Sequence, residues 1–120
     1  MALIPFDDRD GFIWMDGKMM PWREAKIHVL THGLHYGSTI FEGQRVYGGK
    51  IFKLEEHTAR LFASAEVMGF KIPFTQEQIN EASRQVAEAQ GFADAYMRPV
   101  AWRGSEQMSV AAQQSKIHVA

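Results

Sequence analysis

The 120-residue sequence contains no cysteine, so neither a disulfide bond nor a thiolate metal site is available to it. It also has no apolar run that approaches the roughly 20 residues needed to cross a bilayer. A charge excess of one sign is absent too, because 13 basic and 14 acidic residues leave a formal net charge of −1. Such a balance gives no long-range field, so we expect neither nucleic acid nor a membrane as a partner.

The beginning of the sequence lacks the basic region followed by an apolar one that marks a secretory signal. We therefore expect a cytoplasmic protein. A chain of 120 residues with 46% hydrophobic content is typical of one globular domain, in which roughly two thirds of the unfolded surface becomes buried. No internal repeat or linker divides the chain, so one domain over residues 1–120 is expected.

Two pairs of short apolar segments predict β-hairpins, because each pair is joined by a dipeptide that tolerates positive φ. The pairs are residues 12–15 with 18–20 around Asp16-Gly17, and residues 40–47 with 50–53 around Gly48-Gly49. In the second pair, strict alternation places Phe41, Arg45 and Tyr47 on one face of the strand. We interpret Glu42 as a framework residue that pairs with Arg45.

Residues 95–103 alternate in the same way, with Tyr96 and Arg98 on one face. Pro99 has no backbone donor and therefore indicates an edge or a bulge in this segment. A phenol and a guanidinium two residues apart on a strand can hold one carboxylate, although the bare sequence favours an ordinary surface pair. Another strand-like run begins at Lys116, and its abrupt stop at Ala120 is interpreted as a cut end.

Residues 55–68 predict a helix that ends at Gly69, and a capping box at Thr75 to Gln78 predicts a second helix that ends at Gly91. The first helix carries an apolar stripe at helical spacing, made of Leu54, Leu61, Ala65 and Met68. Together the elements predict an α+β fold, with an antiparallel sheet and two helices.

Arg60 lies on the first helix beside its apolar stripe. A planar guanidinium suits two-point binding of a phosphate group, which a lysine does not provide. The alternative is a solvated ion pair with Glu56, one helical turn earlier, and the residues alone favour this alternative.

Three histidines, His28, His32 and His35, stand at spacings that one helix face would present together as zinc ligands. Gly33 and Gly37 interrupt such a helix, and no glutamate lies between the histidines as the catalytic zinc motif requires. We therefore expect no metal site. His32 and His35 are expected instead to fix the backbone of this turn through hydrogen bonds.

Several motifs occur in order along nearly the whole chain: His32, His35-Tyr36-Gly37, Phe41-Glu42-Gly43 and Arg45, then His57-Thr58-Ala59-Arg60-Leu61, then Tyr96-Met97-Arg98-Pro99. Together they resemble the fold-type IV, or class IV, pyridoxal-phosphate aminotransferases, most closely the branched-chain amino acid aminotransferases. Members of that family are much longer. The resemblance implies that residues 1–120 form the small N-terminal domain of the D-amino acid aminotransferase-like fold, and that the larger domain with the cofactor lysine is missing.

The resemblance also implies transfer of an amino group between a branched-chain L-amino acid (leucine, isoleucine or valine) and 2-oxoglutarate, with pyridoxal 5'-phosphate as cofactor. A homodimer or a higher homo-oligomer is implied as well. Arg60 is expected to bind the cofactor phosphate. The implied substrate-binding residues are Tyr96 and Arg98 at the carboxylate, and Tyr36, Phe41 and Val110 around the side chain, with Tyr36 and the loop of Val110 crossing from the other subunit. No catalytic residue is expected here, so the chain alone should be inactive.

Two alternatives stay open. Ser109 stands where the branched-chain enzymes typically have glycine, so the substrate preference is left open. The chain could instead resemble other class IV members, namely D-amino acid aminotransferases, R-selective amine transaminases and aminodeoxychorismate lyase. The second alternative is a non-enzymatic module that binds a metal or an anion through the histidines or Arg60. For Tyr36, Phe41 and Val110, simple packing in the apolar core is the competing interpretation.

Overall fold

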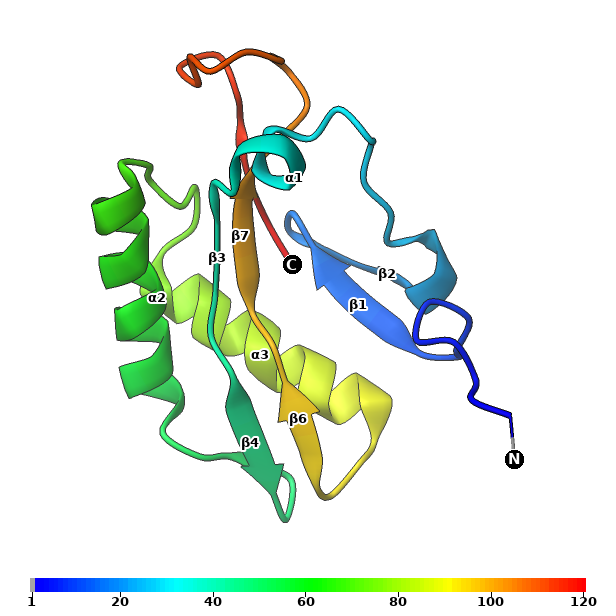
Figure 1. Ribbon diagram of the computed structural model, residues 1–120. Helices are drawn as coiled ribbons and strands as arrows, with labels where there is room; N and C mark the ends of the chain where they lie inside the picture. Colours follow the sequence, from blue (N-terminus) through cyan, green and yellow to red (C-terminus); the bar gives the residue numbers. More distant parts are fainter. Residues whose placement is uncertain (1) are drawn as a thin grey trace.

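Two long helices lie on one side of a set of short antiparallel strands in the computed structural model, which describes residues 2–120 (Figure 1). In chain order the elements are β1 (Phe12–Met15), β2 (Lys18–Pro21), the 3-10 helix η1 (Trp22–Glu24), α1 (His32–Tyr36), β3 (Thr39–Phe41), β4 (Gln44–Tyr47), β5 (Lys50–Ile51), α2 (Leu54–Met68), α3 (Gln76–Gln90), β6 (Ala95–Met97), β7 (Val100–Arg103) and β8 (Ile117–Val119). The expected α+β class is confirmed. Among the described residues, no helix is long and apolar enough to span a membrane.

The strands form the β1–β2 hairpin and two three-stranded antiparallel sheets, in the orders β3–β7–β8 and β5–β4–β6. The two larger sheets share one uninterrupted register, since Phe41 lies opposite Val100 and Gln44 lies opposite Met97. Between these pairs the Glu42 N–H donates to the Pro99 carbonyl at 3.0 Å, while Pro99 has no N–H to return the bond. The ladder is therefore interrupted without an inserted residue.

This interruption corrects one expectation and refines another. The single strand expected over residues 40–47 is wrong, because Glu42 and Gly43 separate β3 from β4. No bulge forms at Pro99, but β6 is an edge strand, which was the other possibility. Alternation nevertheless continues through the gap: Glu42, Gln44 and Val46 are buried, whereas Phe41, Arg45 and Tyr47 are exposed on the opposite face as expected.

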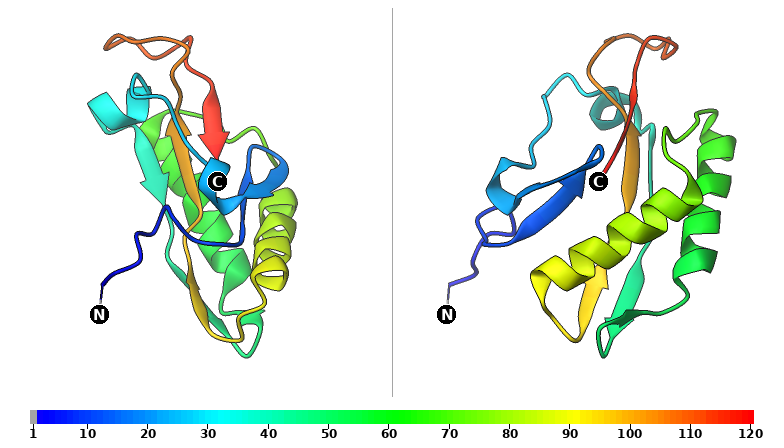
Figure 2. Two further views of the ribbon diagram at one scale, coloured as in Figure 1. Left: turned by 90° about the vertical axis from the view of Figure 1, so that its right-hand side faces the viewer. Right: turned by 180° about the vertical axis from the view of Figure 1, so that it is seen from behind.

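The helices cover the buried face of these strands: α3 crosses behind them in Figure 1 and in front of them in the right-hand view of Figure 2, which is seen from behind. Helix α2 turns its apolar stripe inward and ends at Gly69 in the left-handed region, with φ at 77°. Helix α3 begins with the expected capping box, in which Thr75 Oγ1 accepts from the Gln78 N–H at 3.1 Å and Gln78 Oε1 accepts in return. The shared core consists mainly of Ile40, Leu61, Ala65, Phe70, Ile72, Ile79, Ala101 and Val119.

The β1–β2 hairpin turns at Asp16 and Gly17, whose φ angles are 50° and 95°. This is the positive-φ turn expected from the dipeptide. The tip of the hairpin lies beside β8 in both views of Figure 2, and the Asp16 N–H donates to the Val119 carbonyl at 2.8 Å. Residues more than 100 positions apart in sequence are thereby joined.

Candidate functional site

Two groups of side chains stand out around the β3–β4 connection. The first, here called the Glu42 cluster, consists of Glu42, His57 and Arg60. The second, here called the Arg98 face, consists of Phe41, Tyr96 and Arg98. Because successive strand residues point to opposite faces, Glu42 is buried beneath α2 while Phe41 is exposed on the other side.

The Glu42 cluster is built around a carboxylate whose side chain is only 5% exposed. Arg60 Nε donates to Oε2 at 2.7 Å and Arg60 Nη2 donates to Oε1 at 2.7 Å, which is a two-point ion pair. His57 Nδ1 lies 2.8 Å from Oε1. Helix α2 supplies both partners three residues apart, a spacing that places them on one side of the helix.

The hydrogen bonds from Arg60 hold the pKa of Glu42 below its ordinary value. Burial acts in the opposite direction, and His57 adds a smaller effect that also lowers this pKa. In turn, the hydrogen bond to Glu42 raises the pKa of Arg60. Both members of the pair are therefore ionised at neutral pH, so the guanidinium is a fixed positive charge.

Arg60 keeps one edge available for a ligand. Within residues 2–120 its hydrogen bonds use only Nε and Nη2, and 66% of its side chain is exposed. The remaining N–H groups on Nη1 and Nη2 form a fork that suits two oxygens of a phosphate group. The residues present therefore fit an anionic ligand at this position.

Two expected ion pairs are wrong. Arg60 does not pair with Glu56, whose carboxylate lies 3.4 Å from Lys53 Nζ instead. Arg45 does not pair with Glu42, because alternation sends its side chain to the exposed face, where its guanidinium carbon lies 5.8 Å from the centre of the Tyr47 ring. The packing of α2 against β3 brings Arg60 to the carboxylate in its place.

The Arg98 face combines one cation with two aromatic rings. Arg98 Nε donates to the Tyr96 hydroxyl at 3.1 Å, so the expectation that these two side chains project together is confirmed. The guanidinium carbon lies 4.2 Å from the centre of the Phe41 ring, within cation–π range. Phe41 is 53% exposed and Tyr96 is 52% exposed, so neither is a core residue.

Gly43 gives Tyr96 the room to lie across the strands. A Cβ atom at Gly43 would stand 2.7 Å from the Tyr96 hydroxyl oxygen, which is closer than real contacts allow, and 3.1 Å from Cε2, which is tight. The sequence pattern marks Gly43 only as part of the Phe41-Glu42-Gly43 motif. Its role in placing Tyr96 depends on the pairing of β4 with β6, which no local signal reveals.

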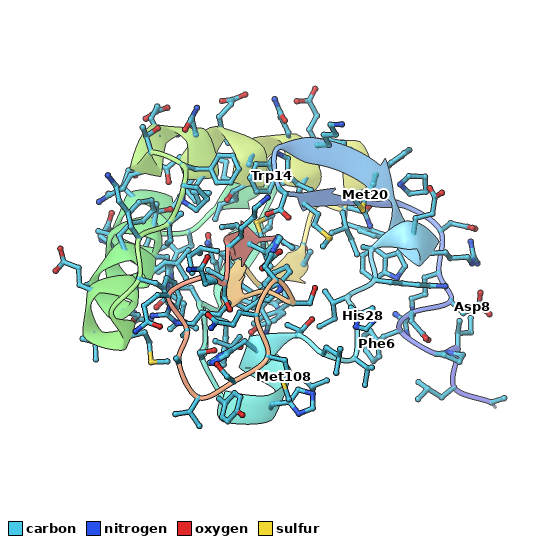
Figure 3. All side chains as sticks on the ribbon, turned by 90° about the horizontal axis from the view of Figure 1, so that it is seen from above. Phe6, Asp8, Trp14, Met20, His28 and Met108 are labelled. Atoms are coloured by element: carbon cyan, nitrogen blue, oxygen red, sulfur yellow. The ribbon has the colours of Figure 1, made fainter. Side chains whose placement is uncertain are left out.

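Tyr36 and Val110 lie at another end of the molecule. The Tyr36 ring is 4.6 Å from the His32 ring in α1, and Val110 is 82% exposed in the loop of residues 104–116, called here the 104–116 loop. Figures 1 and 3 both place this loop beside α1, and the His32 N–H donates to the Gly104 carbonyl at 2.9 Å. Neither side chain is part of the core. Within one chain the segments that carry them, α1 and the 104–116 loop, lie side by side, whereas the Arg98 face is on β3, β6 and the connection from β6 to β7.

The histidines do not share one helix face, because α1 begins only at His32 and leaves His28 outside. His35 Nε2 is 2.7 Å from the Val29 carbonyl, so this residue fixes backbone as expected. His32 Nδ1 instead bonds the Ser38 hydroxyl at 2.7 Å, which is a side chain. In the part of the chain that the structure describes, no group of three potential metal ligands was found.

Comparisons with known proteins agree with this architecture. The family described as amino-transferase class IV matches residues 39–120. The branched-chain-amino-acid aminotransferase of Pseudomonas aeruginosa is 48% identical over 116 residues, which cover 93% of this chain and 38% of that protein. The Escherichia coli enzyme of the same name is 38% identical over 103 residues, which cover 82% of this chain and 33% of the enzyme. The chain therefore spans less than two fifths of these relatives.

Solved structures give the same picture. The branched-chain aminotransferase from Thermoproteus uzoniensis with norvaline has a TM-score of 0.86 and 34% identity, with 92% of this chain and 39% of that chain covered. A second branched-chain amino acid aminotransferase, complexed with N-(5'-phosphopyridoxyl)-L-glutamate, has a TM-score of 0.85 and 39% identity, with 93% of this chain and 40% of that chain covered.

Proposed function

Because this chain belongs to the class IV aminotransferases, as its match over residues 39–120 establishes, we propose that it supplies the phosphate-binding and carboxylate-binding side chains of a branched-chain amino acid aminotransferase. The reaction moves an amino group between leucine, isoleucine or valine and 2-oxoglutarate. The family and the fold were both expected from the sequence motifs, and both are confirmed. The substrate pair and the residue roles are proposals.

Arg60 is the proposed anchor for the phosphate group of pyridoxal 5'-phosphate. The observation that carries this role is the two-point bond to buried Glu42, which fixes the guanidinium while its other edge stays exposed. A phosphate that binds there meets donors already oriented, so little side-chain freedom is lost on binding. Bound pyridoxal phosphate supplies the electron sink that the amino-group transfer needs.

Arg98 and Tyr96 are the proposed anchors for the substrate carboxylate. Tyr96 accepts a hydrogen bond from Arg98 Nε, which leaves the other guanidinium N–H groups and the phenol proton to donate outward. Phe41 stacks on the guanidinium and lines the space for an aliphatic side chain. A cation beside an apolar wall matches the two ends of a branched-chain amino acid.

Tyr36 and Val110 are proposed to complete the side-chain pocket of a second copy of the chain. Both are exposed, and Figure 1 shows the segments that carry them, α1 and the 104–116 loop, at the top of the ribbon, whereas β6 with Tyr96 is toward the bottom. This arrangement suits a homodimer in which each copy closes the pocket of the other. We propose in addition that residues 1–120 are the small domain, that the cofactor lysine lies outside this sequence, and that the chain alone is inactive.

The test is visible absorbance of the longer protein that contains this chain, measured with pyridoxal phosphate before and after adding L-leucine. The expected result is a band from bound cofactor that decreases when leucine is added. A protein that binds no cofactor would contradict the proposal. A band that responds to a D-amino acid or an R-amine but not to leucine would keep the cofactor site and reject the branched-chain substrate.

A further inference from the structure

His118 in β8 lies between two carboxylates that come from distant segments. Its Nδ1 is 2.7 Å from Asp16 Oδ2 in the β1–β2 turn, and its Nε2 is 2.9 Å from Glu106 Oε2 in the 104–116 loop. The ring also stacks on Trp102 of β7, with 5.7 Å between the ring centres. Asp16, Glu106 and His118 are called here the His118 clasp.

The clasp needs a protonated imidazole. Ionised carboxylates only accept hydrogen bonds, so both ring nitrogens have to carry a proton for both bonds to form. Burial lowers the pKa of His118, but the hydrogen bonds to Asp16 and Glu106 outweigh it, and the pKa is raised above its ordinary value. Burial raises the pKa of Glu106, because it disfavours the charged carboxylate. The hydrogen bonds from His118 and from backbone N–H groups outweigh burial and hold this pKa below its ordinary value.

The two carboxylates also hold backbone on either side of His118. Asp16 Oδ1 accepts from the Val119 N–H at 2.9 Å, and Glu106 Oε1 accepts from the Lys116 N–H at 2.9 Å. Gly104 closes the base of the loop, since its N–H donates to the Lys116 carbonyl at 2.8 Å. The clasp therefore ties the 104–116 loop, β8 and the hairpin tip together.

The charged groups next to the His118 ring come from the β1–β2 turn and the 104–116 loop. The β1–β2 turn contributes Asp16, the 104–116 loop contributes Glu106, and β7 contributes the neutral Trp102. Arg103, the next residue in β7, turns away to the carbonyls of Ala112 and Gly69. Lys116 is the last residue of the 104–116 loop, two positions before His118, and is exposed to solvent.

We propose that His118 is a positioning residue for the 104–116 loop, and that the proton shared with Glu106 holds this loop, and with it Val110, in the place where it meets substrate. The contact with substrate rests on the proposed function, whereas the coupling of the loop to the proton does not. Since folding favours the protonated ring, His118 is protonated below about pH 6.5, and the clasp opens as pH rises through the raised pKa of His118. It also weakens in acid, where Glu106 takes up a proton.

The experiment is an NMR titration of the chain, following the His118 ring protons and the backbone amides of residues 104–116. The loop amides are expected to shift with the same midpoint as His118, and that midpoint is expected above about 6.5. In His118→Gln the loop amides should be insensitive to pH over this range. His28→Gln is the matched control, because His28 is exposed and its ring accepts a hydrogen bond from the nearby Leu30 N–H, and it should leave the coupling intact.

Glu106→Gln removes the bond between His118 and the 104–116 loop and keeps the bond between His118 and Asp16. It is also the variant to use if His118→Gln does not fold. The variant keeps Asp16 on the ring, so the His118 midpoint is expected to decrease while the loop amides lose their shared titration. Loop amides that titrate unchanged in either variant would overturn the inference, as would a wild-type loop that ignores the His118 titration. The measurement uses neither cofactor nor substrate, so failure of the proposed function leaves its outcome unaffected.

Discussion

Arg60 and Arg98 are held in opposite ways, although the residues that hold them are neighbours in the chain. Glu42 binds Arg60 through two charged hydrogen bonds beneath α2. Phe41 contacts Arg98 through the face of its ring on the exposed side, where Arg98 also donates a hydrogen bond to the Tyr96 hydroxyl. One dipeptide thus anchors two guanidinium groups on the two faces of the same strands.

The difference fits the two proposed ligands. A buried carboxylate fixes one cation firmly, as suits a cofactor phosphate that stays bound through many turnovers. An aromatic ring and a phenol leave the other cation more freedom, as suits a substrate carboxylate that enters and leaves. The comparison predicts that the two arginines can be disabled independently.

The largest effect is expected when each of the two arginines, Arg60 and Arg98, is replaced by alanine separately in the longer protein. Arg60→Ala should weaken pyridoxal phosphate binding about 10- to 100-fold, the range for losing hydrogen bonds to a charged group. Arg98→Ala should leave cofactor binding unchanged and raise the KM for leucine by a similar factor. Cofactor titration and steady-state kinetics measure the two effects, each variant being the control for the other. Loss of both properties in both variants would contradict the separation.

Gly43→Ala should disturb the Arg98 face alone. The new Cβ meets the far end of the Tyr96 side chain, which can rotate away, so the fold is expected to stay intact. The KM for leucine should rise about 10-fold, because Tyr96 then no longer lines up with Arg98. Kinetics together with a thermal melt give the answer. If the melting temperature of Gly43→Ala changes while the KM for leucine does not, Gly43 contributes to stability and not to the Arg98 face.

Glu42→Gln should change the response of the fold to acid. The pKa of Glu42 is below its ordinary value of about 4.3 in the folded chain, so its ion pair stabilises the fold above that value and is lost as pH falls below it. As pH falls below about 4.3, the urea concentration at the unfolding midpoint should therefore decrease in the wild type. Part of this decrease should be absent in Glu42→Gln. Denaturation midpoints across this range measure it. Parallel curves for the two proteins would rule out a role for this pair.

The smallest effect is expected from the contact between Phe41 and Arg98. A double-mutant cycle with Phe41→Leu and Arg98→Leu should give a coupling energy of about 0.5–1 kcal/mol, the range for exposed cation–π pairs. The pair of Arg45 with Tyr47, whose separation of 5.8 Å is longer, is the matched control and should couple less. Urea denaturation supplies the free energies. Equal coupling energies in the two pairs would contradict a specific role for Phe41 in holding Arg98.

Local signals in the sequence accounted for most of the secondary structure. Asp16-Gly17 predicted the hairpin turn, Thr75 and Gln78 predicted the start of α3, and strand alternation predicted that Tyr96 and Arg98 project together. Each of these depends on residues within about four positions of one another. The family resemblance added the candidate site residues, whose roles stay proposals, while the gap between β3 and β4 escaped detection because Glu42 and Gly43 preserve the alternation.

The sequence by itself determined that Phe41, Arg45 and Tyr47 share one strand face, where the two long helices α2 and α3 start and stop, and which family the chain belongs to, because these follow from short-range periodicity, capping and motif order. Only the tertiary structure decided the partners of the charged groups. Glu42 met Arg60 and not Arg45, and His118 met Asp16 across 102 positions in sequence. Ion pairs form between groups that packing brings within a few ångströms, and separation along the chain does not set that distance.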